Sequence, residues 1–198
     1  MARRKDHTRE ELKEMAIQSG RKIIDKQGIK NLTMRKISGD IGYTVGTLYN
    51  LFDDFEDLML HINAQTLDDL FAEFEDKLST SKNKNGASFL KKIAQLYISF
   101  AERNFHLWSV LTDYEHEADK RPEWYQQKTE RLFSIVEDAI RNDCANAKQA
   151  ARSAKILWAS VHGICVLGLN GRLDMVQAES VDTLTNTLID NYMAGLKG

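Results

Sequence analysis

The chain has 198 residues, of which 42% are hydrophobic and 28% charged, and its formal net charge is −2. It is long enough to bury one sizeable core and to carry a small appended domain. Its two cysteines fit a reducing cytoplasm better than a disulfide framework, and no export signal or long apolar span is visible. Residues 1–50 hold 11 basic and 6 acidic side chains, whereas the remainder balances to −7. A basic module on an acidic body indicates nucleic-acid binding at one end only.

The first predicted helix covers about residues 8–27. Thr8 and Glu11 have the spacing of a capping box, apolar residues follow at helical intervals, and Gly28 ends the pattern. The chain has a single proline, and because proline interrupts helices, this favours long uninterrupted helices.

Two short helices with a tight turn between them are predicted next. Thr33 can cap the first with its hydroxyl, and Gly42 ends it because glycine accepts a left-handed backbone. Thr44 can cap the second, which carries small polar residues at its tip. This order is the plan of a helix-turn-helix, in which the second helix enters the DNA major groove.

The rest of the chain reads as amphipathic helices separated by polar breaks. They are predicted over about 54–78, 88–100, 105–111, 122–140, 147–168 and 180–194, with the clearest loops at 79–87 and 171–179. This makes about nine helices and no strand pattern, so the predicted fold class is all-α.

The segment Leu32–Leu58, LTMRKISGDIGYTVGTLYNLFDDFEDL, resembles the TetR family of bacterial transcriptional regulators. The resemblance rests on a G-T-L-Y-x-x-F core followed by E-x-L, which stands here as Gly46, Thr47, Leu48, Tyr49, Phe52, Glu56 and Leu58. Tyr43 replaces a small valine of the family, Leu51 a common histidine and Phe55 a common lysine. The last two positions often contact phosphates in the family. The later run WASVHG, with Trp158, His162 and Gly163, resembles the W-H-G signature of one family branch.

The resemblance implies a helix-turn-helix DNA-binding domain over residues 1–53 and a helical ligand-binding and dimerisation domain over residues 54–198. It implies a homodimeric transcriptional regulator of the bacterial cytoplasm that needs no cofactor, is not an enzyme and binds no membrane. The expected activity is that of a repressor, released from a palindromic double-stranded DNA operator by a small-molecule effector.

The expected DNA contacts lie on the two short helices. Short side chains that let a helix sit deep in the groove are Thr44, Val45, Gly46, Thr47 and Asn50. Expected phosphate contacts come from Thr33, Arg35, Lys36 and, as in the resembled family, Tyr49. Leu48 and Phe52 are expected in the core, Tyr43 either packs or reaches a phosphate, and a basic arm of Arg3, Arg4 and Lys5 can follow a groove.

The C-terminal body carries aromatic residues that either form ordinary core or line an effector cavity. The residues expected at such a cavity are Phe71, Tyr97, Phe100, Trp108 and Tyr114, and an apolar or aromatic small molecule is the expected effector. The last two long helices offer a dimer surface, since the resembled family builds a four-helix interface from this pair in each subunit. Its expected residues are Ile156, Ser160, Gly163, Leu167, Leu184, Leu188 and Tyr192.

Two alternatives stay open at this point. One is a TetR-like DNA-binding protein without a small-molecule effector. The other is a helical enzyme or metal-binding protein with an appended helix-turn-helix. Asp113 and His116 have a helical spacing that could suit a metal, but paired Glu-x-x-His motifs are missing. Cys165 lies in an apolar run and is expected to be an inert buried thiol, with a redox sensor as the other reading.

Overall fold

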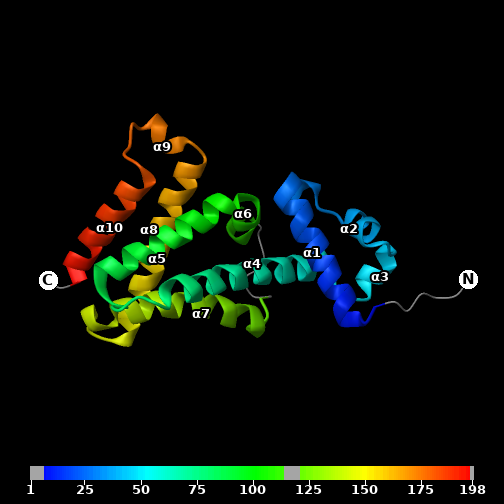
Figure 1. Ribbon diagram of the computed structural model, residues 1–198, viewed down its shortest axis with the longest axis horizontal. Coiled ribbons are helices and arrows are strands. Elements are labelled where there is room, and N and C mark those ends of the chain that lie inside the picture. The colour runs from blue at the N-terminus through cyan, green and yellow to red at the C-terminus, as the bar shows by residue number, and fades with distance from the viewer. Residues whose placement is uncertain (1–6, 114–120, 197–198) are drawn as a thin grey trace, which may run out of the picture. The chain divides into compact units, whose positions relative to one another are not determined.

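The computed structural model describes residues 7–113 and 121–196, and these form ten α-helices and no strand (Figure 1). The predicted all-α class is therefore confirmed. The helices are α1 Arg9–Gln27, α2 Met34–Ile41, α3 Val45–Tyr49, α4 Phe55–Leu78, α5 Gly86–Arg103, α6 Phe105–Asp113, α7 Glu123–Ile140, α8 Ala147–Leu169, α9 Arg172–Met175 and α10 Val181–Leu196. None of these helices combines the length and apolar character needed to span a membrane.

Local sequence signals set both ends of α1. The Thr8 hydroxyl accepts from the Glu11 backbone N–H at 3.2 Å, and Glu11 Oε2 accepts from the Thr8 backbone N–H at 2.6 Å. This reciprocal capping box holds the pKa of the Glu11 carboxyl below its ordinary value. At the other end of α1, Gly28 has φ 77°, and its N–H donates to the Ile24 carbonyl.

One helix was not predicted. The single turn α9 lies inside the stretch expected to be a loop, directly after Gly171, which has φ 66°. Four residues are too short for apolar periodicity to be visible in a sequence. Helix α5 is longer than predicted, since it begins at Gly86, two residues before the predicted Ser88, and continues to Arg103.

The chain forms two compact units, and α4 contributes to both. The first unit takes Met1–Thr66 with Asn104–Tyr125, and the second takes Leu67–Arg103 with Gln126–Gly198. These units do not divide at residue 53, where the functional domains were expected to meet. Instead, the N-terminal part of α4 packs with the preceding helices, because Leu58, Met59 and Ile62 are fully buried in their core.

The first unit has a core in which all of its helices take part. Ile24 of α1, Ile37 of α2, Leu48 of α3 and Val110 of α6 are nearly or fully buried in the same cluster. Helix α1 crosses α4 so closely that a Cβ added to Gly20 would lie 2.6 Å from Ile62 Cδ1. The core thus fixes α2 and α3 against α1 and the start of α4.

The second unit is a bundle in which α10 contacts both α5 and α8. The end of α8 packs closely on the start of α10, since a Cβ added to Gly168 would collide with Val181 Cγ2. Helix α4 is held to α7 by Asp68, whose carboxylate accepts from Lys128 Nζ at 2.6 Å. Salt bridges of this exposed kind contribute little stability, so apolar burial holds the bundle.

Candidate nucleic-acid interface

Helix α2 begins and ends where the sequence predicted. The Thr33 hydroxyl accepts from the Lys36 backbone N–H at 3.2 Å. Gly42 ends the helix with φ 76° and ψ 27°, and the Tyr43 N–H then donates to the Ser38 carbonyl at 2.9 Å. The left-handed glycine turns the chain sharply enough for α3 to start two residues later.

Helix α3 presents a small exposed tip. The Thr44 hydroxyl accepts from the Thr47 backbone N–H at 3.2 Å and lies 3.0 Å from Thr47 Oγ1. The Thr47 side chain is therefore engaged within the turn and is half-buried, as is Val45, which packs partly against the core. Thr44, Gly46 and Asn50 are exposed. These three residues are the accessible ones among those expected to read DNA bases. Val45 and Thr47 are less accessible.

The residues expected to contact phosphates are all exposed. Thr33, Arg35 and Lys36 lie together at the start of α2, and the Lys36 ammonium donates to the neutral amide oxygens of Gln27 at 3.4 Å and Asn31 at 3.3 Å. Tyr49 is 54% exposed at the end of α3 and so is not part of the core. Hydroxyl and cationic side chains of this kind are suited to binding the phosphates of the DNA backbone. The basic arm expected at Arg3, Arg4 and Lys5 lies outside the described residues.

The apolar positions of the motif hold α3 in place. Leu48 and Phe52 are 0% and 1% exposed, as expected of core residues. Leu51 is also buried, and Phe55 packs partly against the same core. Leu51 and Phe55 stand where relatives often contact phosphate, but here these side chains stabilise the junction between α3 and α4.

Tyr43, which the sequence expected either to pack or to reach a phosphate, packs on His7. Its ring is half-buried, and its hydroxyl lies 2.8 Å from Nδ1 of His7, just before α1. The two rings meet edge to face with centroids 6.1 Å apart. This pair ties the turn of the helix-turn-helix to the start of α1. Sequence reasoning missed it because 36 residues separate the partners.

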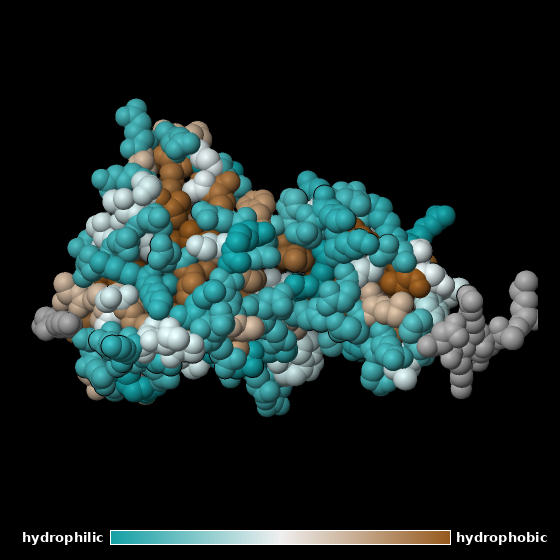
Figure 2. Space-filling model, viewed as in Figure 1, coloured by the Kyte–Doolittle hydropathy of each residue, from teal (hydrophilic) through white to brown (hydrophobic). Residues whose placement is uncertain are grey.

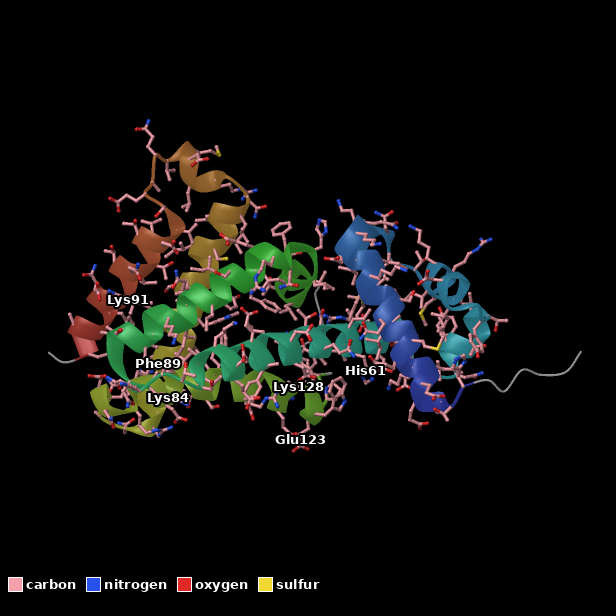
Figure 3. The ribbon with its side chains drawn as sticks, in the orientation of Figure 1. His61, Lys84, Phe89, Lys91, Glu123 and Lys128 are labelled. Carbon is pink, nitrogen blue, oxygen red and sulfur yellow. The ribbon has the colours of Figure 1, made fainter. Side chains whose placement is uncertain are left out.

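A second aromatic group supports the end of the helix-turn-helix. The His61 ring on α4, labelled in Figure 3, stacks on Trp124 with centroids 4.8 Å apart and planes at 12°. It also lies 5.8 Å from the Phe52 ring. His61 Nε2 is 3.5 Å from Asp57 Oδ1, one turn earlier. On Phe52, Lys13 Nζ lies 5.3 Å from the ring centroid. Phe52 is thus held by α1 and by α4.

The residues expected to line an effector cavity are divided by the compact units. Phe71, Tyr97 and Phe100 belong to the second unit, Trp108 belongs to the first, and Tyr114 lies outside the described residues, as does His116 of the possible metal pair. Phe100 is buried, whereas the half-buried Phe71 ring has the Arg131 guanidinium 3.5 Å from its centroid. A cation over the ring stabilises it by an electrostatic attraction to the aromatic face.

Tyr97 is part of an aromatic array that the sequence did not reveal. Its hydroxyl lies 2.8 Å from Nδ1 of His162, whose ring stacks on Trp158 at 5.3 Å. Trp158 in turn meets the edge of Phe133 at 5.6 Å. The W-H-G residues therefore join α5, α7 and α8. The only signal in the sequence is the spacing of Trp158 and His162, which places them on one face of α8.

The expected dimer residues form an open stripe on α8. Ile156 and Leu167 are 42% and 41% exposed, and a Cβ added to Gly163 would meet nothing within 4 Å. Ser160 lies between them and turns its hydroxyl to the Ile156 carbonyl at 2.9 Å. On α10, Leu184, Leu188 and Tyr192 are half-buried. Figure 2 shows apolar side chains gathered over α8 and α10 on the visible face.

Known proteins resemble this chain over its whole length. Residues 90–192 match the family model described as "Tetracyclin repressor-like, C-terminal domain", which is more than half of the chain. A protein named as an uncharacterized HTH-type transcriptional regulator of Mycobacterium tuberculosis is 23% identical over 171 residues, covering 86% of this chain and 76% of that protein.

Solved structures share the fold. A protein of unknown function from Rhodococcus sp. RHA1 has a TM-score of 0.75 at 19% identity, with 100% of both chains covered. A TetR transcriptional regulator from Rhodococcus sp. RHA1 has a TM-score of 0.69 at 13% identity, with 93% of this chain and 97% of that chain covered.

The helix-turn-helix of α2 and α3, the family match and these relatives define a DNA-binding transcriptional regulator. The chain belongs to the TetR family. The relatives above whose names state a function are transcriptional regulators.

Proposed function

We propose that this regulator binds a pseudo-palindromic operator as a homodimer and is a repressor released by a small molecule. The observation that carries the proposal is the exposed tip of α3, held by a buried junction to α4. One five-residue helix reaches few base pairs, so two copies related by a two-fold axis are needed for a specific site. Acting on DNA, the protein would work in the cytoplasm.

In this proposal, residues 1–53 bind DNA, and residues 54–198 bind the effector and form the dimer. The two roles are joined by the short connection from Tyr49 to Phe55, in which Leu51 and Phe52 are buried. Because α4 is one continuous helix of 24 residues, a movement along it would carry α3 with it. A change in the separation of two α3 helices would then weaken operator binding, since DNA fixes the half-site spacing.

The proposed effector is apolar or aromatic and binds near Phe71, Tyr97 and Phe100 of the second unit. Support comes from the aromatic side chains that α4 and α5 contribute to the second unit. The Tyr97 hydroxyl and His162 add a polar pair that can orient a ligand by a hydrogen bond.

The switch is tested by measuring effector and operator binding together. Apolar and aromatic compounds are screened by thermal shift on the full-length protein, and each hit is titrated against labelled operator. Reciprocal antagonism with a coupling of about 1–3 kcal/mol is expected. A compound that binds the body tightly but leaves operator affinity unchanged would contradict the coupling and favour a regulator without this effector site.

The proposed dimer surface consists of Ile156, Ser160, Gly163 and Leu167 on α8 with Leu184, Leu188 and Tyr192 on α10. Its support is the exposure of the large apolar side chains of α8 in the isolated chain. A stripe with a glycine at its centre lets a second helix approach closely.

A further inference from the structure

A polar groove in the second unit differs in chemistry from the aromatic residues assigned to the effector. It lies between α5 and α10 and has a volume of about 270 Å³. Helix α5 contributes Lys91, Lys92 and Gln95 to its lining, and α10 contributes Asp182, Thr185 and Asn186. Figure 3 labels Lys91 on α5, where α10 runs beside it. The two walls therefore present hydrogen-bonding groups and charges of both signs.

Thr185 is the residue of this groove that most needs a partner. It is 2% exposed, and its hydroxyl oxygen has no hydrogen-bond partner among the described residues. A buried hydroxyl that is left unpaired costs free energy, because it has lost its bonds to water. The hydroxyl oxygen itself is covered, so a ligand in the groove reaches it only when the Thr185 side chain rotates, and a hydrogen bond made in that way would remove this cost.

The two lysines of the groove differ in their charge environment. Lys91 Nζ is 2.7 Å from Asp190 Oδ2, so a carboxylate already balances its charge. Lys92 Nζ donates to the neutral Ser81 hydroxyl at 2.8 Å, which leaves its positive charge available to an anion. Across the groove, the exposed carboxylate of Asp182 disfavours a second negative charge on that anion and can accept from a donor group.

We propose that this groove binds a small monocarboxylate that also carries a hydroxyl or ammonium donor. Lys92 binds the carboxylate, Asp182 accepts from the donor group, and the Thr185 hydroxyl completes the set. A ligand held in this way bridges α5 and α10 of one protomer. The groove lining shares no residue with the proposed aromatic effector site, and ligand binding to the groove is measured on the free protein without operator.

The test is isothermal titration calorimetry of the full-length protein with named probes. Glycerate and gluconate represent hydroxy acids, serine and glutamine represent amino acids, and glycerol and serinamide are the matched probes without a carboxylate. Saturable binding is expected for one of the two carboxylate classes, and none for the probes without a carboxylate. The class that binds identifies the donor group.

Two variants and one control locate the site. Lys92→Met should weaken binding by about tenfold or more, since it removes the charge-assisted hydrogen bond. Thr185→Val should also weaken binding, and yet raise the melting temperature, because the same volume is filled without an unpaired hydroxyl. Lys84→Met, which removes an exposed lysine outside the groove lining, should leave the affinity unchanged.

Several results would overturn the proposal. They are an absence of saturable binding by every carboxylate probe, an affinity unchanged in both groove variants, and an equal loss in Lys84→Met, which would indicate unspecific charge attraction. A lower melting temperature in Thr185→Val would show that the hydroxyl already has a partner in the fold, and it would contradict the proposal as well.

Discussion

The Tyr49 phenol is the exposed side chain of α3 that can reach a phosphate while Leu48 anchors the same helix in the core. Tyr49→Phe removes only the hydroxyl, and one hydrogen bond to a charged group is typically worth about 1.5–3 kcal/mol. We expect weaker binding to specific and unspecific duplexes alike, as measured by fluorescence anisotropy. Because Tyr49 is exposed, the melting temperature should not change, and a selective loss on the specific site alone would contradict a phosphate contact.

Asn50 provides the contrasting substitution on the same tip. Its exposed amide can bond a base edge, so Asn50→Ala should alter the preferred base at one half-site position rather than lower all affinities equally. A discrimination loss of about 1–3 kcal/mol at that position is expected in competition binding with single-base variants of the operator. A uniform loss across all variants would assign Asn50 to the phosphate backbone instead.

Cys165 is expected to be unreactive in the folded protein. It is fully buried, and burial raises the pKa of its thiol to about 11 from an ordinary value of 9.0. The raised pKa favours the protonated thiol, so this stabilisation is present at neutral pH and is lost as the pH rises from about 9 through 11. Alkylation at neutral pH should modify Cys165 only after denaturation, and rapid labelling of the native protein would support a redox role.

At the residue scale, the sequence predicted the interactions between residues that are close together in the chain. The caps at Thr8, Thr33 and Thr44 follow from hydroxyl oxygens placed three residues before a free backbone N–H. It did not predict the pairs His7–Tyr43 and His61–Trp124, because a polar or stacked pair of distant residues leaves no periodic mark. Both pairs fasten the helix-turn-helix.

At the element scale, Gly39 within α2 and Gly42, which ends it, form a matched pair. Gly42 has φ 76°, whereas Gly39 is a helical, exposed position at which an added Cβ would meet nothing within 4 Å. Gly42→Ala should destabilise the protein by about 1–2 kcal/mol, because a side chain disfavours the left-handed backbone. Gly39→Ala should stabilise it by roughly 0.5–1 kcal/mol, because alanine loses less conformational freedom in a helix. Thermal denaturation checks both, and equal effects of the two variants would contradict the proposed role of the turn.

Element types were predictable from apolar periodicity, but the grouping of elements was not. The sequence placed α4 in the C-terminal part, yet its first turns are buried with α1, α2 and α3. Helix α6 also joins the first unit, through Leu107 and Val110, although it comes after α5 in the chain. Periodicity tells which face of a helix is buried and leaves open which helices cover it.

At the scale of the whole molecule, the proposed α8–α10 surface can be tested by a single charge. Gly163→Glu should give a monomer and abolish operator binding, since it places an unpaired charge at the centre of the stripe. Ala72→Glu, which adds the same charge at an exposed position of α4, is the matched control and should stay dimeric. Light scattering distinguishes the two, and a dimer that survives Gly163→Glu would exclude this interface.

The central claim is sequence-specific DNA binding through α2 and α3, and selection from a randomised duplex library tests it most directly. At moderate salt, we expect enrichment of a pseudo-palindrome with half-sites about one helical turn apart or somewhat more, and an affinity that falls steeply with added salt as counterions are released. The Asn50→Ala protein should enrich an altered half-site. If the wild-type protein enriches no sequence under these conditions, the assignment of α2 and α3 as a DNA-reading element is contradicted.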